Sequence, residues 1–249
     1  MKVTFNMKEN KNAFTRHLIF FLVMTISAST TSLSAGELQS QKPDAMWDYK
    51  TINGKTYQLS VFLPSNYSEG ESFPTFVIFH GGSWNAGEAR WHYPDCAYWS
   101  SRGMIAVSVD YRLKSRDNVQ VPLECVKDAK SAIRFLRQNA KKLKVNPDKI
   151  VSAGGSAGGQ LAAATSMVTV PRANDTSDNL SFSSTPNATI LFNPWFRCEK
   201  ELSPTHLITP NLPPMIIFAG GKDTAIPVQS IIDFKKAMSD SGNETTLYI

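Results

Sequence analysis

The stretch Lys149-Ile150-Val151-Ser152-Ala153-Gly154-Gly155-Ser156-Ala157-Gly158-Gly159 runs from an apolar segment into a serine framed by glycines. The apolar residues before the glycines predict a buried strand, and the small residues after the serine predict a closely packed helix. A G-x-S-x-G sequence between a strand and a helix is typical of a nucleophile elbow, where the serine occupies a strained corner. Glycine is needed at 154 and 158 because a Cβ atom there would collide with neighbouring backbone. Ser156 is therefore the predicted nucleophile.

A second glycine motif follows an apolar segment nearer the N-terminus. Phe73–Phe79 reads as a buried parallel strand, and His80-Gly81-Gly82-Ser83-Trp84 comes directly after it. Two successive glycines let backbone N–H groups approach a ligand closely, as stabilisation of an oxyanion requires. Gly81 and Gly82 are the predicted loop donors, and the N–H of Ala157 is their predicted partner from the elbow. Each motif alone also fits a plain tight turn, and the two together favour the catalytic interpretation.

Four motifs taken together resemble the α/β-hydrolase carboxylesterases, most closely the hormone-sensitive-lipase-like and the feruloyl or acetyl-xylan esterase-like branches. These motifs are His80 to Trp84, Val109-Asp110-Tyr111-Arg112, Gly154 to Gly159, and Gly220-Gly221-Lys222-Asp223 with the following Ile226-Pro227. The resemblance covers about residues 45–249. Ser83 departs from it, because the lipase branch usually has a third glycine there. The resemblance implies an α/β-hydrolase fold, a serine esterase without a cofactor, and a catalytic triad in the chain order Ser, Asp or Glu, His.

Asp223 is the predicted acid of this triad. It follows the apolar segment Pro214–Ala219 and a pair of glycines, which is where the resemblance places the acid. Its role would be to fix the tautomer of an imidazole and to stabilise the imidazolium that forms in the transition state. An aspartate after two glycines is also an ordinary turn residue, and its combination with Ser156 favours the catalytic role.

The triad base has no evident counterpart in the sequence. Its four histidines, which all precede Asp223, are His17, His80, His92 and His206. In the family resembled, the base lies in the loop after the last strand, which corresponds to a point beyond Ile249. We therefore expect a fold that is missing its C-terminal end, one sheet face left uncovered by the last helix, and weak or no activity. Two alternatives stay open: His206 supplies the imidazole, or the protein binds a ligand without turnover.

Composition and cysteine count set limits on the class of protein. A length of 249 residues fits one α/β domain. Residues 1–35 carry +3 of the formal net charge of +5, so about +2 remains for the rest, and nucleic-acid binding gains no support. Cys96, Cys125 and Cys198 are an odd number, which excludes a disulfide framework and leaves room for one bridge. No cysteine and histidine residues have the spacing of a zinc site, so neither a metal nor a cofactor is expected.

The N-terminal segment has the order of residues found in secretory signal peptides. Residues 1–35 begin with basic side chains, continue through the apolar run Leu18–Ile26 and end in small residues. The apolar run is about half of the ~20 residues needed to span a bilayer, so no stable membrane span is expected. These features predict a secreted or periplasmic protein with a signal peptide at 1–35, an exposed lead-in at 36–46 and the α/β-hydrolase domain at 47–249.

Strands and helices are predicted to alternate along the domain. Asn53-Gly54 before the alternating segment Thr56–Leu63 predicts a hairpin of two edge strands, and helical spacing predicts a helix over Val121–Leu143. Such alternation indicates a mainly parallel sheet with helices on both faces. The remaining expected elements are strands at Met104–Val109, Ala188–Phe192, Pro214–Ala219 and near Ile249, helices at Ala157–Val168 and Pro227–Ser241, and a wall near the site at Asn193–Leu212.

The sequence thus predicts an exported serine esterase that hydrolyses small carboxylic esters through an acyl-enzyme on Ser156. Acetyl or feruloyl esters of polysaccharide are the substrates that the resemblance and the export signal favour. A dipeptidyl-peptidase-like serine peptidase would share the sheet and the elbow, but the His80-Gly81-Gly82 loop favours esters. A non-catalytic binding protein with the α/β-hydrolase fold is the alternative from another class.

Overall fold

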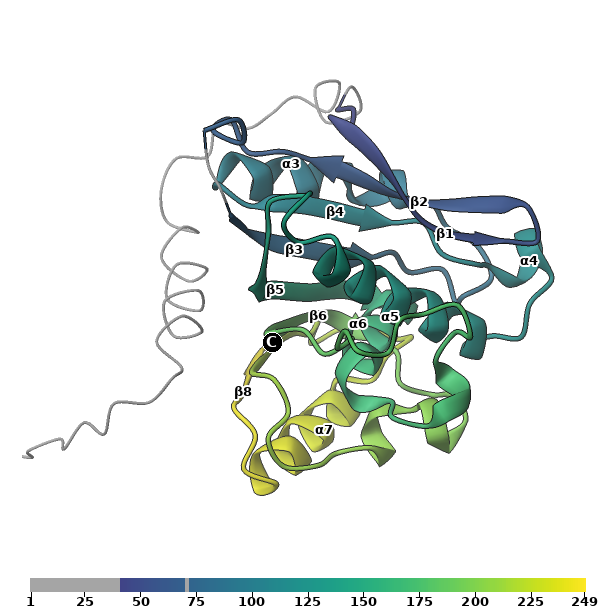
Figure 1. Cartoon of the computed structure of the whole chain (residues 1–249). Coiled ribbons are helices and arrows are strands. Elements are labelled where there is room, and N and C mark those ends of the chain that lie inside the picture. The colour runs from purple at the N-terminus through teal and green to yellow at the C-terminus, as the bar shows by residue number, and fades with distance from the viewer. Residues whose placement is uncertain (1–40, 70–71) are drawn as a thin grey trace, which may run out of the picture.

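Residues 41–69 and 72–249 are described by the computed structural model, and they form a twisted sheet with helices on both faces (Figure 1). The strand order is β1-β2-β4-β3-β5-β6-β7-β8, in which β1 pairs antiparallel with β2, β2 pairs antiparallel with β4, and the pairs from β4 to β8 are all parallel. The strands are β1 (Ala45–Ile52), β2 (Lys55–Phe62), β3 (Phe73–Phe79), β4 (Ile105–Val109), β5 (Val145–Ser156), β6 (Ala188–Pro194), β7 (Met215–Phe218) and β8 (Thr245–Tyr248).

Three long helices cover one face of the sheet, and a fourth helix covers part of the other. Side chains of α5, α6 and α7 share one apolar cluster with the strands, whereas α3 belongs to a separate cluster on the opposite face. This arrangement confirms the predicted α/β fold with a mainly parallel sheet. The helices are α3 (Tyr93–Ser101), α4 (Lys114–Asp117), α5 (Leu123–Gln138), α6 (Ala157–Met167) and α7 (Val228–Asp240), with 3-10 turns η2 (Ala89–His92), η3 (Pro171–Ala173), η4 (Lys200–Leu202) and η5 (Pro204–His206).

Burial along the strands follows their place in the sheet. Every residue of β4 is buried, and β3 is buried at all positions except one, because helices lie over both faces of the central strands. The edge strand β1 instead alternates between half-buried and exposed positions over its first residues. The Asn53-Gly54 turn joins β1 to β2 as predicted, with both residues at positive φ. Among the described residues, no helix has the length and apolar character to cross a membrane.

The structure corrects three details of the expected organisation. β1 begins at Ala45 rather than near Trp47, because Ala45 already pairs with Val61. Helix α5 ends at Gln138 rather than continuing to Leu143, since the Asn139 side chain donates to the Phe135 carbonyl and caps the helix there. All three cysteines are free thiols, so the single bridge that their number allowed is not formed. The signal peptide at 1–35 lies outside the described residues.

One part of the α3 face is open. Phe192, Phe218 and Tyr248 lie opposite one another on β6, β7 and β8, and their rings stack in a row with centroids 5.4 Å and 5.3 Å apart. Phe192 is 41% exposed and Tyr248 is 39% exposed. In the part of the chain that the structure describes, α3 reaches β2, β3 and β4 but no helix covers this aromatic row.

A buried group of charges fastens the other end of the sheet. Asp128 on α5 accepts hydrogen bonds from the Arg112 guanidinium, at 2.7 and 2.8 Å, and from Lys50 of β1 at 2.8 Å. Asp175 lies 2.9 Å from the same lysine and 3.5 Å from the same guanidinium. Buried charges are tolerated only when they are paired and hydrogen-bonded. These contacts therefore fix the segment after β4, which includes Tyr111, to α5 and β1.

Asp128→Asn should lower the free energy of unfolding by about 3 kcal/mol or more, because two buried cations would lose their shared carboxylate. The matched control is Asp240→Asn, which removes the partner of Lys236 in an exposed ion pair and should change the stability far less, because solvent screens such pairs. Urea denaturation followed by circular dichroism measures both changes. Equal losses in the two variants would contradict the structural role given to Asp128.

Candidate active site

The elbow has the strained geometry predicted from its sequence. Ser156 is the last residue of β5 and the N-cap of α6, and its backbone has φ 53° and ψ −121°. Such a conformation costs a non-glycine residue about 1–3 kcal/mol and persists only where the surroundings enforce it. The Ser156 carbonyl accepts a hydrogen bond from the N–H of Trp195 at 2.9 Å, which ties the corner to the segment after β6.

Two glycines allow the backbones around Ser156 to approach one another. A Cβ atom at Gly154 would lie 2.2 Å from the carbonyl oxygen of Gly158. A Cβ atom at Gly158 would lie 2.0 Å from the carbonyl oxygen of Phe79, the last residue of β3. Both distances are far shorter than atoms tolerate, so the first turn of α6 can cross over β3 only with glycine at these positions. A side chain at either position would therefore cause the collision that the motif implies.

The predicted oxyanion loop lies beside the elbow. A Cβ atom at Gly81 would be 3.4 Å from the Cβ of Ser156. Gly82 has φ 110°, and a Cβ there would overlap the carbonyl oxygen of Ala86 at 2.0 Å. Ser83, which replaces the third glycine of the lipase branch, nevertheless adopts the left-handed region with φ 55°. The loop and the start of α6 thus bring Gly81, Gly82 and Ala157 to the same corner as the nucleophile.

His80 supports this loop from beneath. Its side chain is fully buried, and its Nδ1 lies 2.7 Å from the carbonyl oxygen of Gly81. Tyr111 stacks on the imidazole, with centroids 4.2 Å apart, and its hydroxyl donates to the His80 carbonyl oxygen at 2.7 Å. Burial lowers the pKa of His80 to about 4, although the hydrogen bond to Gly81 opposes that change. The imidazole is therefore neutral near neutral pH.

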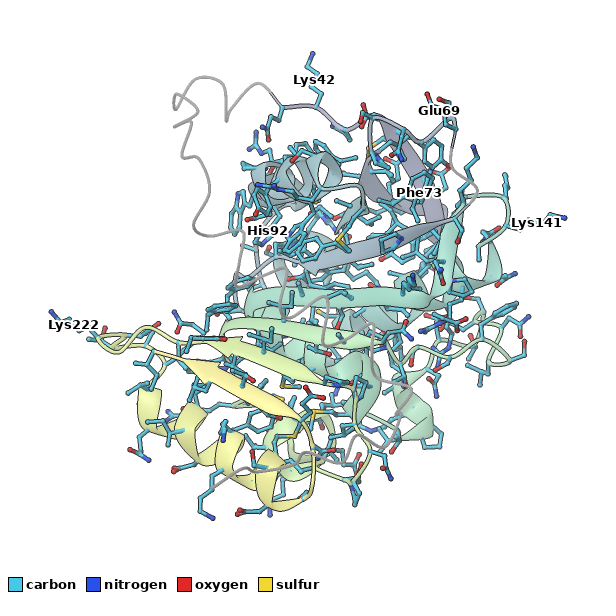
Figure 2. The ribbon with its side chains drawn as sticks, turned by 90° about the vertical axis from the view of Figure 1, so that its left-hand side faces the viewer. Lys42, Glu69, Phe73, His92, Lys141 and Lys222 are labelled. Carbon is cyan, nitrogen blue, oxygen red and sulfur yellow. The ribbon has the colours of Figure 1, made fainter. Side chains whose placement is uncertain are left out.

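Asp223 lies in a turn at the same edge of the sheet. Its Oδ1 accepts hydrogen bonds from the N–H groups of Ala225 and Ile226, at 2.8 and 2.9 Å. Oδ2 has no hydrogen-bond partner within residues 41–69 and 72–249. In Figure 2, the neighbouring Lys222 lies on the side of the molecule opposite to Phe73, the first residue of β3, so this turn is at the carboxyl ends of the parallel strands.

Asn193 is a residue of this site that sequence reasoning missed. It follows Phe192 near the end of β6, has φ 40°, and its Oδ1 accepts a hydrogen bond from the Gly220 N–H at 2.7 Å. Gly220 in turn accepts a hydrogen bond from the Asp223 N–H at 3.1 Å. Asn193 therefore anchors the turn that carries the predicted acid. Its signal in the sequence was an asparagine at a strand end, which tolerates positive φ better than most residues do.

An apolar cavity of about 450 Å³ lies between the segment after β6 and the start of α7. One wall is the segment after β6, which includes Trp195 next to Ser156, and the other is Ile226 and Pro227 just after Asp223. The predicted wall at 193–212 is thus in the expected place. The remaining lining residues are Pro194, Phe196, Arg197, Cys198, Ser203, Thr205, His206, Ser230 and Ile231.

The described histidines are placed in three different surroundings. His80 is held under the oxyanion loop, and His92 pairs with Asp95 at 2.7 Å on the surface. His206 lines the cavity, with its Nδ1 3.2 Å from the Thr205 hydroxyl. None of them forms a hydrogen bond with Ser156 or Asp223 in the described part of the chain. His17 lies outside that part. No group of three or more potential metal ligands occurs in residues 41–69 and 72–249.

Comparison with known proteins gives consistent matches. The family model described as BD-FAE matches residues 59–193, which span the oxyanion loop and the elbow. A solved structure of Thermogutta terrifontis esterase 2 phosphoramylated by tabun is 40% identical, has a TM-score of 0.78, and is covered over 81% of its chain by 82% of this one. The propionate-bound structure of the same esterase has a TM-score of 0.79 and 37% identity, with coverages of 87% and 85%.

Two Mycobacterium tuberculosis enzymes are more distant relatives. Carboxylesterase NlhH is 35% identical over 94 residues, which make up 37% of this chain and 28% of the relative. Esterase LipQ is 25% identical over 228 residues, which make up 78% of this chain and 52% of the relative. The chain therefore spans about a quarter to a half of the length of these relatives.

Gly158→Ala should destabilise the protein by about 1–3 kcal/mol, because the new methyl group would overlap the Phe79 carbonyl and force the backbone apart. Gly155→Ala is the matched control from the same motif. A Cβ at Gly155 would meet nothing closer than the Phe192 carbonyl oxygen at 3.5 Å, which is an ordinary contact. Urea denaturation should therefore separate the two variants, and similar midpoints would contradict the crossing described above.

His80 should make stability depend on pH. Between about pH 6.5 and about pH 4, the unfolded chain binds a proton at His80 that the folded protein does not, so the free energy of unfolding falls as the pH falls. The contribution is fully present above about pH 6.5. His80→Asn should lose less stability over this range, by roughly 1–3 kcal/mol. Urea denaturation of both proteins across this range measures the difference, and parallel curves would contradict it.

Proposed function

The chain belongs to the BD-FAE family of α/β-hydrolase carboxylesterases, and on that basis we propose that it is an exported serine esterase that cleaves small carboxylic esters. The observation that carries the proposal is the strained backbone of Ser156, held beside a glycine loop and an acid turn at one sheet edge. A strained serine of this kind is typical of a nucleophile, because it presents Oγ at the exposed top of the sheet.

In the proposed reaction, the Ser156 Oγ attacks the carbonyl carbon of the ester. The serine proton passes to a base and then to the leaving alcohol, and an acyl-enzyme remains. The N–H groups of Gly81, Gly82 and Ala157 hold the oxyanion that forms on the carbonyl oxygen. Water then attacks the acyl-enzyme and releases the carboxylic acid. Asp223 orients the imidazole that serves as the base.

Small acyl groups suit the apolar cavity near the candidate site. This cavity measures about 450 Å³, and its lining includes Ile226 and Trp195, whose backbone N–H donates to the Ser156 carbonyl. Thermogutta terrifontis esterase 2, to which the chain is similar, is described with propionate and with butyrate bound. We extend the proposal to acetyl or feruloyl esters of polysaccharide, because residues 1–35 have the order of an export signal and an exported esterase meets such substrates. Those residues lie outside the described part of the chain.

The base is the remaining requirement of the mechanism. An imidazole would have to reach both the Ser156 hydroxyl and Oδ2 of Asp223. His80 and His92 are engaged elsewhere, by the Gly81 carbonyl and by Asp95. In our proposal the described residues by themselves give weak activity, since none of their histidines forms a hydrogen bond with Ser156 and a serine without a base is a neutral alcohol and a poor nucleophile.

Hydrolysis of p-nitrophenyl acetate by the full chain tests this proposal. We expect a weak turnover that Ser156→Ala abolishes and that His206→Ala leaves unchanged. Added imidazole should raise the turnover of the unsubstituted chain above that of Ser156→Ala measured in the same buffer, because a free base can replace the missing one.

Each other outcome has a definite meaning for the proposal. Equal rates for the unsubstituted chain and Ser156→Ala would remove Ser156 as the nucleophile. Loss of turnover in His206→Ala would make His206 the base. Strong turnover without imidazole would overturn the proposed weak activity.

A further inference from the structure

Two hydrogen bonds hold the carbonyl groups of the oxyanion loop. The Tyr111 hydroxyl donates to the carbonyl oxygen of His80 at 2.7 Å, and the His80 Nδ1 lies 2.7 Å from the carbonyl oxygen of Gly81. The Gly81 oxygen can only accept, so the imidazole proton must lie on Nδ1. Successive carbonyls of the loop are therefore bound by one hydroxyl and one imidazole N–H.

These carbonyls determine where the predicted donors point. The His80 carbonyl shares a peptide unit with the Gly81 N–H, and the Gly81 carbonyl shares one with the Gly82 N–H. Both units are trans, and in a planar trans unit the C=O and the N–H point in opposite directions. Each hydrogen bond thus turns one N–H away from the His80 and Tyr111 side chains. Glycine alone would leave these peptide units free to rotate, because it restricts φ and ψ least.

The two side chains are themselves held rigidly. Their rings stack with centroids 4.2 Å apart at an angle of 18°, and neither side chain reaches solvent. Gly87 packs so closely on the imidazole that a Cβ there would lie 2.3 Å from Nδ1. Arg112, the residue after Tyr111, is bound to the buried Asp128. The supporting pair is therefore connected to the buried charges that join β1 and α5.

The other imidazole nitrogen gives independent support for this assignment. His80 Nε2 is buried and has no hydrogen-bond partner among the described residues. A neutral imidazole carries one N–H proton. Burying an N–H group without an acceptor costs more free energy than burying a nitrogen lone pair without a donor. The single proton accordingly goes to Nδ1, where the Gly81 carbonyl accepts it.

We propose that Tyr111 is a positioning residue, which acts with His80 to lock the peptide units of the oxyanion loop so that the Gly81 and Gly82 N–H groups face the developing oxyanion. The assignment rests on the proposed esterase function. Preorganised donors stabilise a transition state because they need no reorientation during the reaction. The lock therefore acts on kcat rather than on substrate binding.

Tyr111→Phe tests the role of the hydroxyl. It should lower the Ser156-dependent kcat for p-nitrophenyl acetate by ~10-fold or more and leave KM nearly unchanged, because the donors matter mainly in the transition state. Tyr67→Phe is the matched control. Its hydroxyl donates to the Leu143 carbonyl at 3.2 Å, near the amino ends of β3 and β5, so its loss should not alter kcat. An unchanged kcat in Tyr111→Phe would overturn the proposal.

A pair of substitutions at His80 separates the hydrogen bond from the packing. The side-chain nitrogen of asparagine is attached to Cγ, as Nδ1 is, whereas that of glutamine lies one bond further, as Nε2 does. Both variants lose the stacked ring. We expect His80→Asn to retain a kcat about tenfold or more above that of His80→Gln, since only asparagine can donate to the Gly81 carbonyl from the right position. Equal kcat values for His80→Asn and His80→Gln would show that the His80 ring acts only through packing, which would overturn the role of its hydrogen bond.

Nuclear magnetic resonance of the chain labelled with ¹⁵N-histidine tests the lock without any turnover. The His80 signals should report a proton on Nδ1 and none on Nε2 at neutral pH, and a proton on Nε2 would overturn the proposal. If the unsubstituted chain shows no Ser156-dependent turnover, the proposed function fails, and the tautomer of His80 still decides whether the lock exists.

Discussion

The contact between Gly158 and the Phe79 carbonyl is the constraint on which the site depends. It lets the first turn of α6 cross directly over the end of β3, where any side chain would overlap the backbone. Because of this crossing, Ser156 at the end of β5 and the loop that leaves β3 occupy one corner. β3 also pairs directly with β5, so that Phe79 lies opposite Gly154. This strand pairing holds the same corner in place within the sheet. The strain at Ser156 persists because both elements around it are fixed.

Much of the fold could be read from the sequence because its signals are local. β3 begins and ends at the predicted residues, since a short apolar run between polar residues is typical of a buried strand. Ser156 could be recognised because two glycines mark the steric demand of the elbow. The end of α5 was misjudged, since the apolar spacing continues beyond Gln138 while an asparagine side chain ends the helix. Boundaries of this kind depend on single hydrogen bonds rather than on periodicity.

The parts of the site that escaped prediction are contacts between distant segments. Tyr111 stood in a recognised motif, yet nothing local shows that its hydroxyl reaches the carbonyl of His80. Asn193 likewise binds Gly220 across the gap between β6 and β7, and its partner could not be known before the strand order. Both contacts support backbone rather than touch a substrate. Sequence motifs therefore predicted the candidate reacting groups, while the order of the strands decided what holds them.

The order of the strands also has a consequence for how the chain folds. The central pair joins β3 to β5, so that Val77 lies opposite Ser152, and β4 must be inserted on the other side of β3. Contacts between residues so far apart in sequence require large loops to close first, and proteins dominated by them fold slowly. No part of the corner around Ser156 can form until the chain from β3 through α6 is complete. During synthesis, the loop after β3 must therefore wait until β5 and α6 have been made before its partner at the elbow exists.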